Sequence, residues 1–148
     1  MKKLLIVFAV SAFFASCGET DTADEKNIST EQRDEAKQDS ANYTSIRWDD
    51  STFIDLGKVE KGRMIEISFP FTNTGDKNLI ITNVSAGCGC TIPEVPKEPF
   101  APGKTGTIKA RFDSKSQPAA VHNKEVFVSA NTTPNTQHRL TFRVEVVE

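Results

Sequence analysis

Two cysteines one residue apart, Cys88 and Cys90, form the clearest chemical motif of the chain. Gly87 precedes the pair and Gly89 separates it, while the third cysteine, Cys17, lies near the N-terminus. Such a pair suits three kinds of chemistry. Two free thiols can pack as small apolar groups, the two sulfurs can form a disulfide, or two thiolates can bind a soft metal ion.

The sequence leaves these three interpretations open. Free cysteine is among the most often buried residue types, so simple packing where a sheet bends accounts for the pair. Residues i and i+2 of an extended strand lie about 6.5–7 Å apart, so a Cys88–Cys90 disulfide requires a turn at Gly89. So small a ring would be strained, and strained disulfides exchange readily with thiols. No Cys-x-x-Cys at a helix N-terminus is present to favour a thiolate.

A metal site would need a further ligand besides the two thiolates. Cu(I) and zinc both accept thiolate and imidazole ligands, and the chain has two histidines, His122 and His138. Cys88 and Cys90, with His122, are therefore the candidate metal ligands, and the pair is also the candidate redox site. No third group that would orient a catalytic cysteine–histidine dyad is identified, and no phosphate-binding loop or Gly-x-Ser-x-Gly occurs. We assign no catalytic residue and no obligatory cofactor.

Apolar and polar residues alternate with period two through most of the chain around this motif. The apolar runs lie at residues 46–48, 53–56, 65–71, 79–84, 108–112, 126–128 and 140–146. No helical period accompanies them. Seven short runs within roughly a hundred residues predict an all-β, immunoglobulin-like antiparallel sandwich over residues 45–148. The run 79–84 is rich in apolar and β-branched residues, which predicts a central strand.

The first residues have the layout of a bacterial export signal. Lys2 and Lys3 are followed by an apolar run at residues 4–14 and small residues at 15 and 16. This run is too short to span a bilayer as a helix, which needs about 20 residues. Residues 14–17, Phe-Ala-Ser-Cys, resemble a bacterial lipobox. We therefore predict a lipoprotein signal peptide at residues 1–16, lipidation of Cys17, and anchoring in the cell envelope, on the periplasmic or surface face of the outer membrane.

Residues 18–44 are acidic and poor in apolar side chains, which predicts a disordered tether behind the lipidated Cys17. Eight acidic and three basic residues give this segment a net charge of −5. Residues 29–37 match a transient helical turn, but no apolar stripe is present to hold it. As a flexible coil the tether would span roughly 30 Å. Three Asp-Ser/Thr-Ala/Thr triplets resemble a bacterial O-glycosylation motif, with Thr22, Ser40 and Ser51 as the candidate acceptors.

The charge of the domain excludes one class of partner and leaves two functional hypotheses. Thirteen basic and twelve acidic residues give residues 45–148 a net charge of +1, so there is no electrostatic basis for nucleic-acid binding. The first hypothesis is a non-enzymatic module that presents a sheet face, a sheet edge or the proline-rich loop 92–102 to an unidentified envelope protein. The second is a thiol redox or Cu(I)/zinc protein acting through Cys88 and Cys90.

Five stretches together resemble a bacterial envelope family known only as domain of unknown function 1573. They are IDLGKV (54–59), FPFTNTG (69–75), LIITNV (79–84), CGCT (88–91) and APGKTGTI (101–108). The resemblance implies an immunoglobulin-type sandwich related to the chaperone-pilus and sperm-protein classes, often behind a lipoprotein signal. It implies no specific activity.

Overall fold

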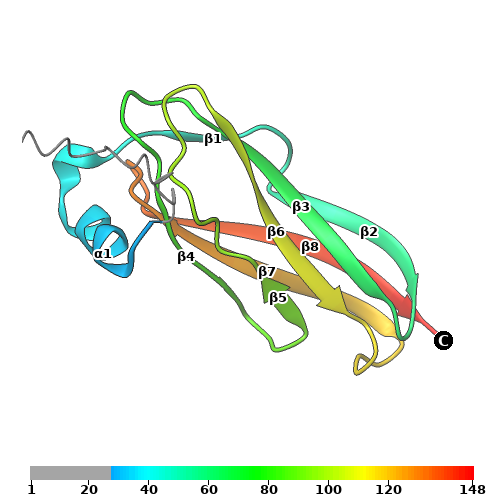
Figure 1. Cartoon of the computed structure of the whole chain (residues 1–148). Coiled ribbons are helices and arrows are strands. Elements are labelled where there is room, and N and C mark those ends of the chain that lie inside the picture. Colours follow the sequence, from blue (N-terminus) through cyan, green and yellow to red (C-terminus); the bar gives the residue numbers. More distant parts are fainter. Residues whose placement is uncertain (1–27) are drawn as a thin grey trace, which may run out of the picture.

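Two four-stranded β-sheets pack face to face and form a sandwich (Figure 1). The computed structural model describes residues 28–148, and the predictions made for residues 1–27 lie outside this range. The strand order is β1-β3-β6-β5 in one sheet and β2-β8-β7-β4 in the other. The strands are β1 (Ile46–Trp48), β2 (Phe53–Glu60), β3 (Met64–Asn73), β4 (Ile81–Ala86), β5 (Thr91–Pro93), β6 (Thr105–Asp113), β7 (Ala120–Ala130) and β8 (Gln137–Val147). The immunoglobulin-like sandwich that the alternating pattern predicts is confirmed.

The strand count and one strand direction differ from the prediction. The described residues form eight strands where seven runs were expected, and the additional strand, β5, has three residues and ends in a proline. It is too short to produce an alternating pattern. β2 pairs with β8 in parallel, with Phe53 opposite Thr141, so a purely antiparallel sandwich is wrong for this pair. Alternation shows which face of a strand is buried, but carries no information about the direction of the neighbouring strand.

The inward-facing side chains of both sheets form one apolar core. On β3, Ile67, Phe69 and Phe71 are buried and alternate with more exposed residues, as period two requires. Phe112 on β6 and Phe142 on β8 meet edge to face across the sandwich, with their ring centroids 5.6 Å apart. Burial of each such side chain contributes about 2–3 kcal/mol, so the core accounts for the packing of the two sheets.

The run predicted to be a central strand lies instead at the edge of its sheet. β4 pairs with β7 alone among the described strands, although Leu79 and Ile81 are fully buried. The run is apolar because Leu79, Ile81 and Val84 belong to the core of the sandwich. In addition, helix α1 (Thr30–Gln38) packs beside the beginning of β4 (Figure 1). The start of β4 is therefore covered by the N-terminal segment rather than by another strand.

The prediction that residues 18–44 are disordered is wrong for residues 28–44. Ser29 caps α1 in a reciprocal capping box, and Ala36 is buried. The guanidinium of Arg33 donates hydrogen bonds to the carbonyl oxygens of Ile81 and Pro96. A short 3₁₀ helix, η1 (Ser40–Asn42), leads on to β1. The segment thus gains order from charged hydrogen bonds to backbone carbonyls, which a count of its apolar residues does not reveal.

A buried asparagine fixes this N-terminal segment to the sandwich. Asn131 donates side-chain hydrogen bonds to the carbonyl oxygens of Asn42 (2.8 Å) and Asn78 (2.9 Å), and accepts one from the Ile80 amide (2.7 Å). The Thr44 amide in turn donates to the Asn131 carbonyl oxygen (2.9 Å). None of the helices among residues 28–148 is long and apolar enough to cross a membrane.

Candidate functional site

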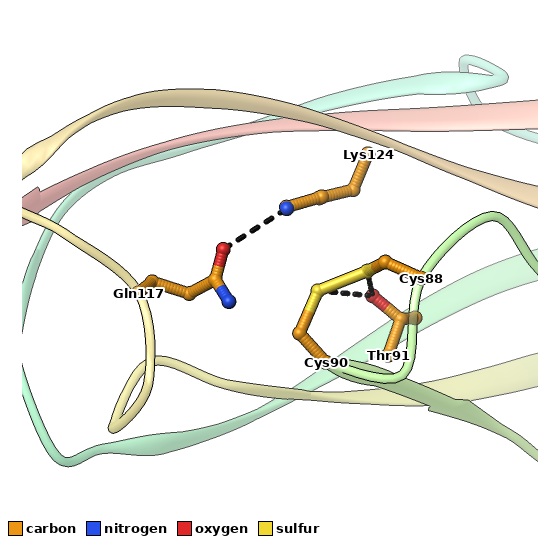
Figure 2. The surroundings of a disulfide bond; sticks show 5 residues. All are labelled: Cys88, Cys90, Thr91, Gln117 and Lys124. Carbon is orange, nitrogen blue, oxygen red and sulfur yellow. Dashed lines mark hydrogen bonds between the residues drawn. A yellow bond between two sulfur atoms is a disulfide. The ribbon is translucent and has the colours of Figure 1, made fainter.

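The two cysteines lie where the chain passes from one sheet to the other. β4 ends at Ala86 and β5 begins at Thr91 in the facing sheet, so residues 87–90 make the crossing. A disulfide joins Cys88 to Cys90, with the two Cα atoms 5.3 Å apart (Figure 2). The Thr91 amide donates to the Cys88 carbonyl oxygen (3.3 Å). This turn brings the cysteines closer together than an extended strand would allow.

Backbone hydrogen bonds attach both ends of this crossing to neighbouring strands. The Gly87 amide donates to the carbonyl oxygen of Glu125 on β7 (3.3 Å). The amide of Asp113, the last residue of β6, donates to the Cys90 carbonyl oxygen (2.9 Å). The crossing is therefore held by one strand of each sheet, independently of the bond between the two sulfurs.

The two sulfurs have unequal surroundings. Cys90 belongs to the apolar core and is 8% exposed, whereas Cys88 packs against that core from a partly exposed position. The hydroxyl oxygen of Thr91, a buried residue, lies 3.6 Å from the Cys88 sulfur and 3.9 Å from the Cys90 sulfur. The disulfide thus joins a partly exposed cysteine to a buried one, and the Thr91 hydroxyl lies within 4 Å of both sulfurs.

A lysine enters the space between the sheets beside the disulfide. Val126 and Val128 on β7 are fully buried, and Lys124 belongs to the same face of the strand because it lies two residues earlier. The pairing of β4 with β7 ends at Val126, so Lys124 lies just beyond the end of β4. Its ammonium donates to the Gln117 side-chain oxygen (3.0 Å), and Figure 2 shows this pair next to the disulfide.

Sequence reasoning found the cysteines and the adjacent Thr91, to which it assigned no role, but missed Gln117 and Lys124. For Lys124 a signal was present, because a period of two continued backward from Val126 and Val128 places it on the inner face. For Gln117 the sequence carries no such signal, since this residue lies in the loop between β6 and β7. Only the fold brings that loop to the cysteines.

The structure does not bring the histidines and cysteines together as a metal site. The His122 ring nitrogen Nε2 bonds to the Pro118 carbonyl oxygen (2.9 Å). Within residues 28–148, no group of three or more His, Cys, Asp or Glu side chains is arranged to hold a metal ion. Packing of free thiols and thiolate coordination both require reduced sulfur, so the geometry favours the disulfide interpretation.

His138 has a structural setting of its own. The Thr132 hydroxyl donates to the Asn135 carbonyl oxygen (2.6 Å), so the His138 Nε2, 2.8 Å from that hydroxyl oxygen, is the donor of their hydrogen bond. The imidazole packs edge to face on Trp48, with ring centroids 5.8 Å apart. Its burial lowers the pKa of His138, because the charged form loses hydration.

The remaining candidate positions lie elsewhere. Cys17 and Thr22 are outside the described residues. Ser40 is exposed at the start of η1, and Ser51 is exposed before β2, where its hydroxyl accepts a hydrogen bond from the Phe53 amide (3.0 Å). Lipidation and glycosylation remain predictions at these four residues.

The domain is an immunoglobulin-like β-sandwich. A short crossing that contains a Cys-Gly-Cys disulfide links its two sheets. The chain belongs to the family described as "Protein of unknown function (DUF1573)", whose model matches residues 46–146. The resemblance found in its motifs is thereby confirmed. No curated protein matches the chain.

Similar solved structures share the fold at low sequence identity. A protein of unknown function from Porphyromonas gingivalis W83 is 15% identical with a TM-score of 0.64, over 72% of this chain and 49% of that chain. The chain therefore spans about half the length of that protein. A PapD-like domain of human CEP192 is 11% identical with a TM-score of 0.55, over 74% and 89% of the two chains. The secreted serine protease VesC from Vibrio cholerae is 13% identical with a TM-score of 0.51, over 76% and 25%.

Replacement of both Cys88 and Cys90 by alanine is expected to leave the sandwich folded. The disulfide closes a loop of three residues, which contributes about 1.6 kcal/mol by the loop-entropy relation, against about 4.7 kcal/mol for a loop of a hundred residues. With a small packing loss, the free energy of unfolding should fall by about 2 kcal/mol in urea titration. Reduced wild-type protein is the control. A fall of more than about 4 kcal/mol would instead make the bond a main support of the fold.

Acidification is expected to destabilise the domain through His138. In the unfolded chain a histidine takes up its proton near pH 6.5, whereas the lowered pKa of His138 delays this in the folded protein. Between those values the unfolded state binds more protons, so stability is lost as the pH falls from 7 through the folded pKa. Urea titrations at several pH values measure this loss. His138→Gln should flatten the profile in that window, and an unchanged slope would contradict the assignment.

Proposed function

We propose that the protein is a lipid-anchored, non-enzymatic module of the bacterial cell envelope. It binds an extended segment of another exported protein, which pairs with the free edge of β4. The observation that carries the proposal is the outer edge of β4, with which no strand of residues 28–148 pairs, together with the exposed Phe127 beside it. Such pairing uses backbone hydrogen bonds for affinity and neighbouring side chains for selectivity.

β4 is the edge strand with the fewest features that prevent pairing. β1 and β5 have three residues each. β2 is longer, but it has an irregular register between Asp55 and Lys58, and both residues are charged. The pKa of Asp55 lies below its usual range, mainly because the Gly57 amide donates a hydrogen bond to its carboxylate, and also because Arg143 binds the same carboxylate. The six residues of β4, Ile-Thr-Asn-Val-Ser-Ala, include neither a charge nor a proline. Charges, bulges and short length are the usual protections of an edge. β4 has an irregular register only at its beginning, between Ile81 and Asn83, and its pairing with β7 is regular from Asn83 to Ala86.

The N-terminal segment occupies only the beginning of this edge. Arg33 binds the Ile81 carbonyl oxygen, which would otherwise be available to a pairing strand. Among residues 28–148, no strand pairs with the outer side of β4. The stretch from Asn83 to Ala86, which leads into the disulfide turn, is therefore the part of the edge available to a partner.

An exposed aromatic side chain lies beside this stretch. Phe127 on β7 is the cross-strand neighbour of Ser85 and is 39% exposed. A strand added to β4 would cover part of the Phe127 ring, which favours a partner segment with alternating apolar residues.

The ordered residues 28–44 determine which side of the domain lies toward the proposed membrane anchor. The Ile28 amide donates to the Lys97 carbonyl oxygen (2.7 Å), close to the Pro96 carbonyl oxygen that Arg33 binds. Residues 18–27 then separate the proposed lipid from this contact, and ten residues reach at most roughly 35 Å. The lipid therefore attaches the domain on the side of β4 and the loop after β5, and keeps the proposed binding edge near the membrane surface.

A photo-crosslinking amino acid at Ser85 is expected to capture one exported protein in intact cells. The matched control is the same substitution at Ser68, which is exposed on the outer face of the inner strand β3. Crosslinked products are identified by mass spectrometry. Ser85→Lys, with the crosslinker moved to Asn83, should abolish the product, because an edge lysine opposes strand pairing. Equal capture at Ser68, or capture that survives Ser85→Lys, would refute binding at this edge.

Cys17 is expected to carry the membrane anchor. Cells supplied with labelled palmitate should label the wild-type chain, and Cys17→Ala should abolish both the label and recovery in the membrane pellet. Cys88→Ala with Cys90→Ala is the control, and should keep both. The gain of about 0.8 kcal/mol per buried methylene group makes a multiply acylated cysteine a stable anchor. A labelled Cys17→Ala chain, or an unlabelled wild type, would remove lipidation from the proposal.

A further inference from the structure

The unequal exposure of the two cysteines indicates where a thiol attacks. Exchange requires a thiolate to reach one sulfur and expel the other. Cys88 is partly exposed, whereas Cys90 is enclosed by the core at 8% exposure. An incoming thiolate therefore meets the Cys88 sulfur and expels Cys90 toward the interior.

Expulsion of a thiolate into an apolar interior is costly unless polar groups receive it. Two such groups are in place. The Thr91 hydroxyl oxygen lies 3.9 Å from the Cys90 sulfur, and Lys124 brings an ammonium group into the space between the sheets (Figure 2). A hydroxyl donor and a nearby cation both favour the thiolate form of a cysteine.

The crossing also keeps its place when the disulfide is open. The Gly87–Glu125 and Asp113–Cys90 backbone hydrogen bonds hold its two ends without the sulfur–sulfur bond. The enclosing loop has only three residues, so opening it releases little chain entropy. The oxidised and reduced forms can therefore share one fold, which an exchange site requires.

We propose that the Cys88–Cys90 disulfide oxidises cysteine pairs of exported proteins by thiol–disulfide exchange. A substrate thiolate attacks the Cys88 sulfur, the Cys88–Cys90 bond breaks, and Cys90 leaves as a thiolate that Thr91 and Lys124 stabilise. The second substrate thiolate then attacks the substrate sulfur of the mixed disulfide and expels Cys88. Two electrons pass from the substrate pair to Cys88 and Cys90, which take up the two protons that the substrate thiols lose. Each chain carries out this exchange once, so the reaction is stoichiometric and consistent with a non-enzymatic module, and it does not depend on the proposed binding edge.

Reduced glutathione is a suitable probe, because its thiol forms a mixed disulfide that a rapid acid quench can trap. The mature chain is purified from its membrane in detergent, and free thiols are alkylated beforehand so that only the Cys88–Cys90 disulfide can react. Glutathione is added without denaturant, the reaction is quenched with acid, and newly released thiols are alkylated. Mass spectrometry of the intact chain and of its peptides then gives the rate and the modified residue. Glutathione is expected on Cys88, with the alkyl group on Cys90.

Variants of Lys124 separate a chemical role from a structural one. Lys124→Gln should slow formation of the mixed disulfide by about tenfold, because the leaving thiolate loses its cation, whereas Lys124→Arg should restore most of the rate. Lys115→Gln, at an exposed position in the loop between β6 and β7, is the matched control and should react like the wild type.

Three results would overturn the proposal. Glutathione attached to Cys90 would reverse the assigned roles. Equal rates for Lys124→Gln and the wild type would remove the cation from the mechanism. A rate that rises in urea in proportion to the unfolded fraction would show that the disulfide reacts only in unfolded chains.

Discussion

The crossing at residues 87–90 carries the chain from one sheet to the other, and the arrangement of the β4–β5 side depends on it. Because β4 and β5 belong to different sheets, neither can pair with the other, and both become edges. The crossing must turn sharply, and the Cys88–Cys90 disulfide lies in that turn. It also fills the end of the core beyond the last β4–β7 pair, where Lys124 enters. The crossing between the sheets therefore accounts for three features together: the exposed edge of β4, the buried Cys90 and the inward Lys124.

The N-terminal segment covers one end of the β4 edge and leaves the other end exposed. At its beginning, the Arg33 guanidinium satisfies the Ile81 carbonyl oxygen, so α1 takes the place of a neighbouring strand without adding one. Toward Ala86 no such cover exists among the described residues. Since α1 rests on one buried alanine and a few charged hydrogen bonds, its attachment is weaker than the packing of the core. A partner strand that extended over the whole edge would have to displace Arg33, so α1 would limit how much of β4 is available.

The sequence predicted what depends on local periodicity and missed what depends on distant contacts. Alternation predicted the sandwich and most inward-facing residues, because burial of one strand face requires it. The parallel β2–β8 pair and the position of β4 at an edge depend on topology, which alternation does not encode. Order in residues 28–44 depends on single hydrogen bonds from Arg33 and Asn131 to groups more than forty residues away. The cysteine pair was evident from its spacing, but the neighbouring Gln117 comes from a loop that only the fold places there.

The inward orientation of Lys124 has two physical explanations. It can stabilise the Cys90 thiolate, or it can protect the exposed end of β7 from pairing with other chains. Beyond Val126, β7 has no β4 residue beside it, and an inward charge on an exposed strand end opposes pairing with other chains. That role requires only a charge at this strand end, with no relation to the sulfurs. It would leave the partial exposure of Cys88 and the Thr91 hydroxyl beside both sulfurs without a use. A disulfide that closes a loop of only three residues also adds less stability than one that closes a long loop. Exchange chemistry accounts for the enclosed leaving sulfur, the hydroxyl and the cation together, and is therefore the more economical explanation of the site.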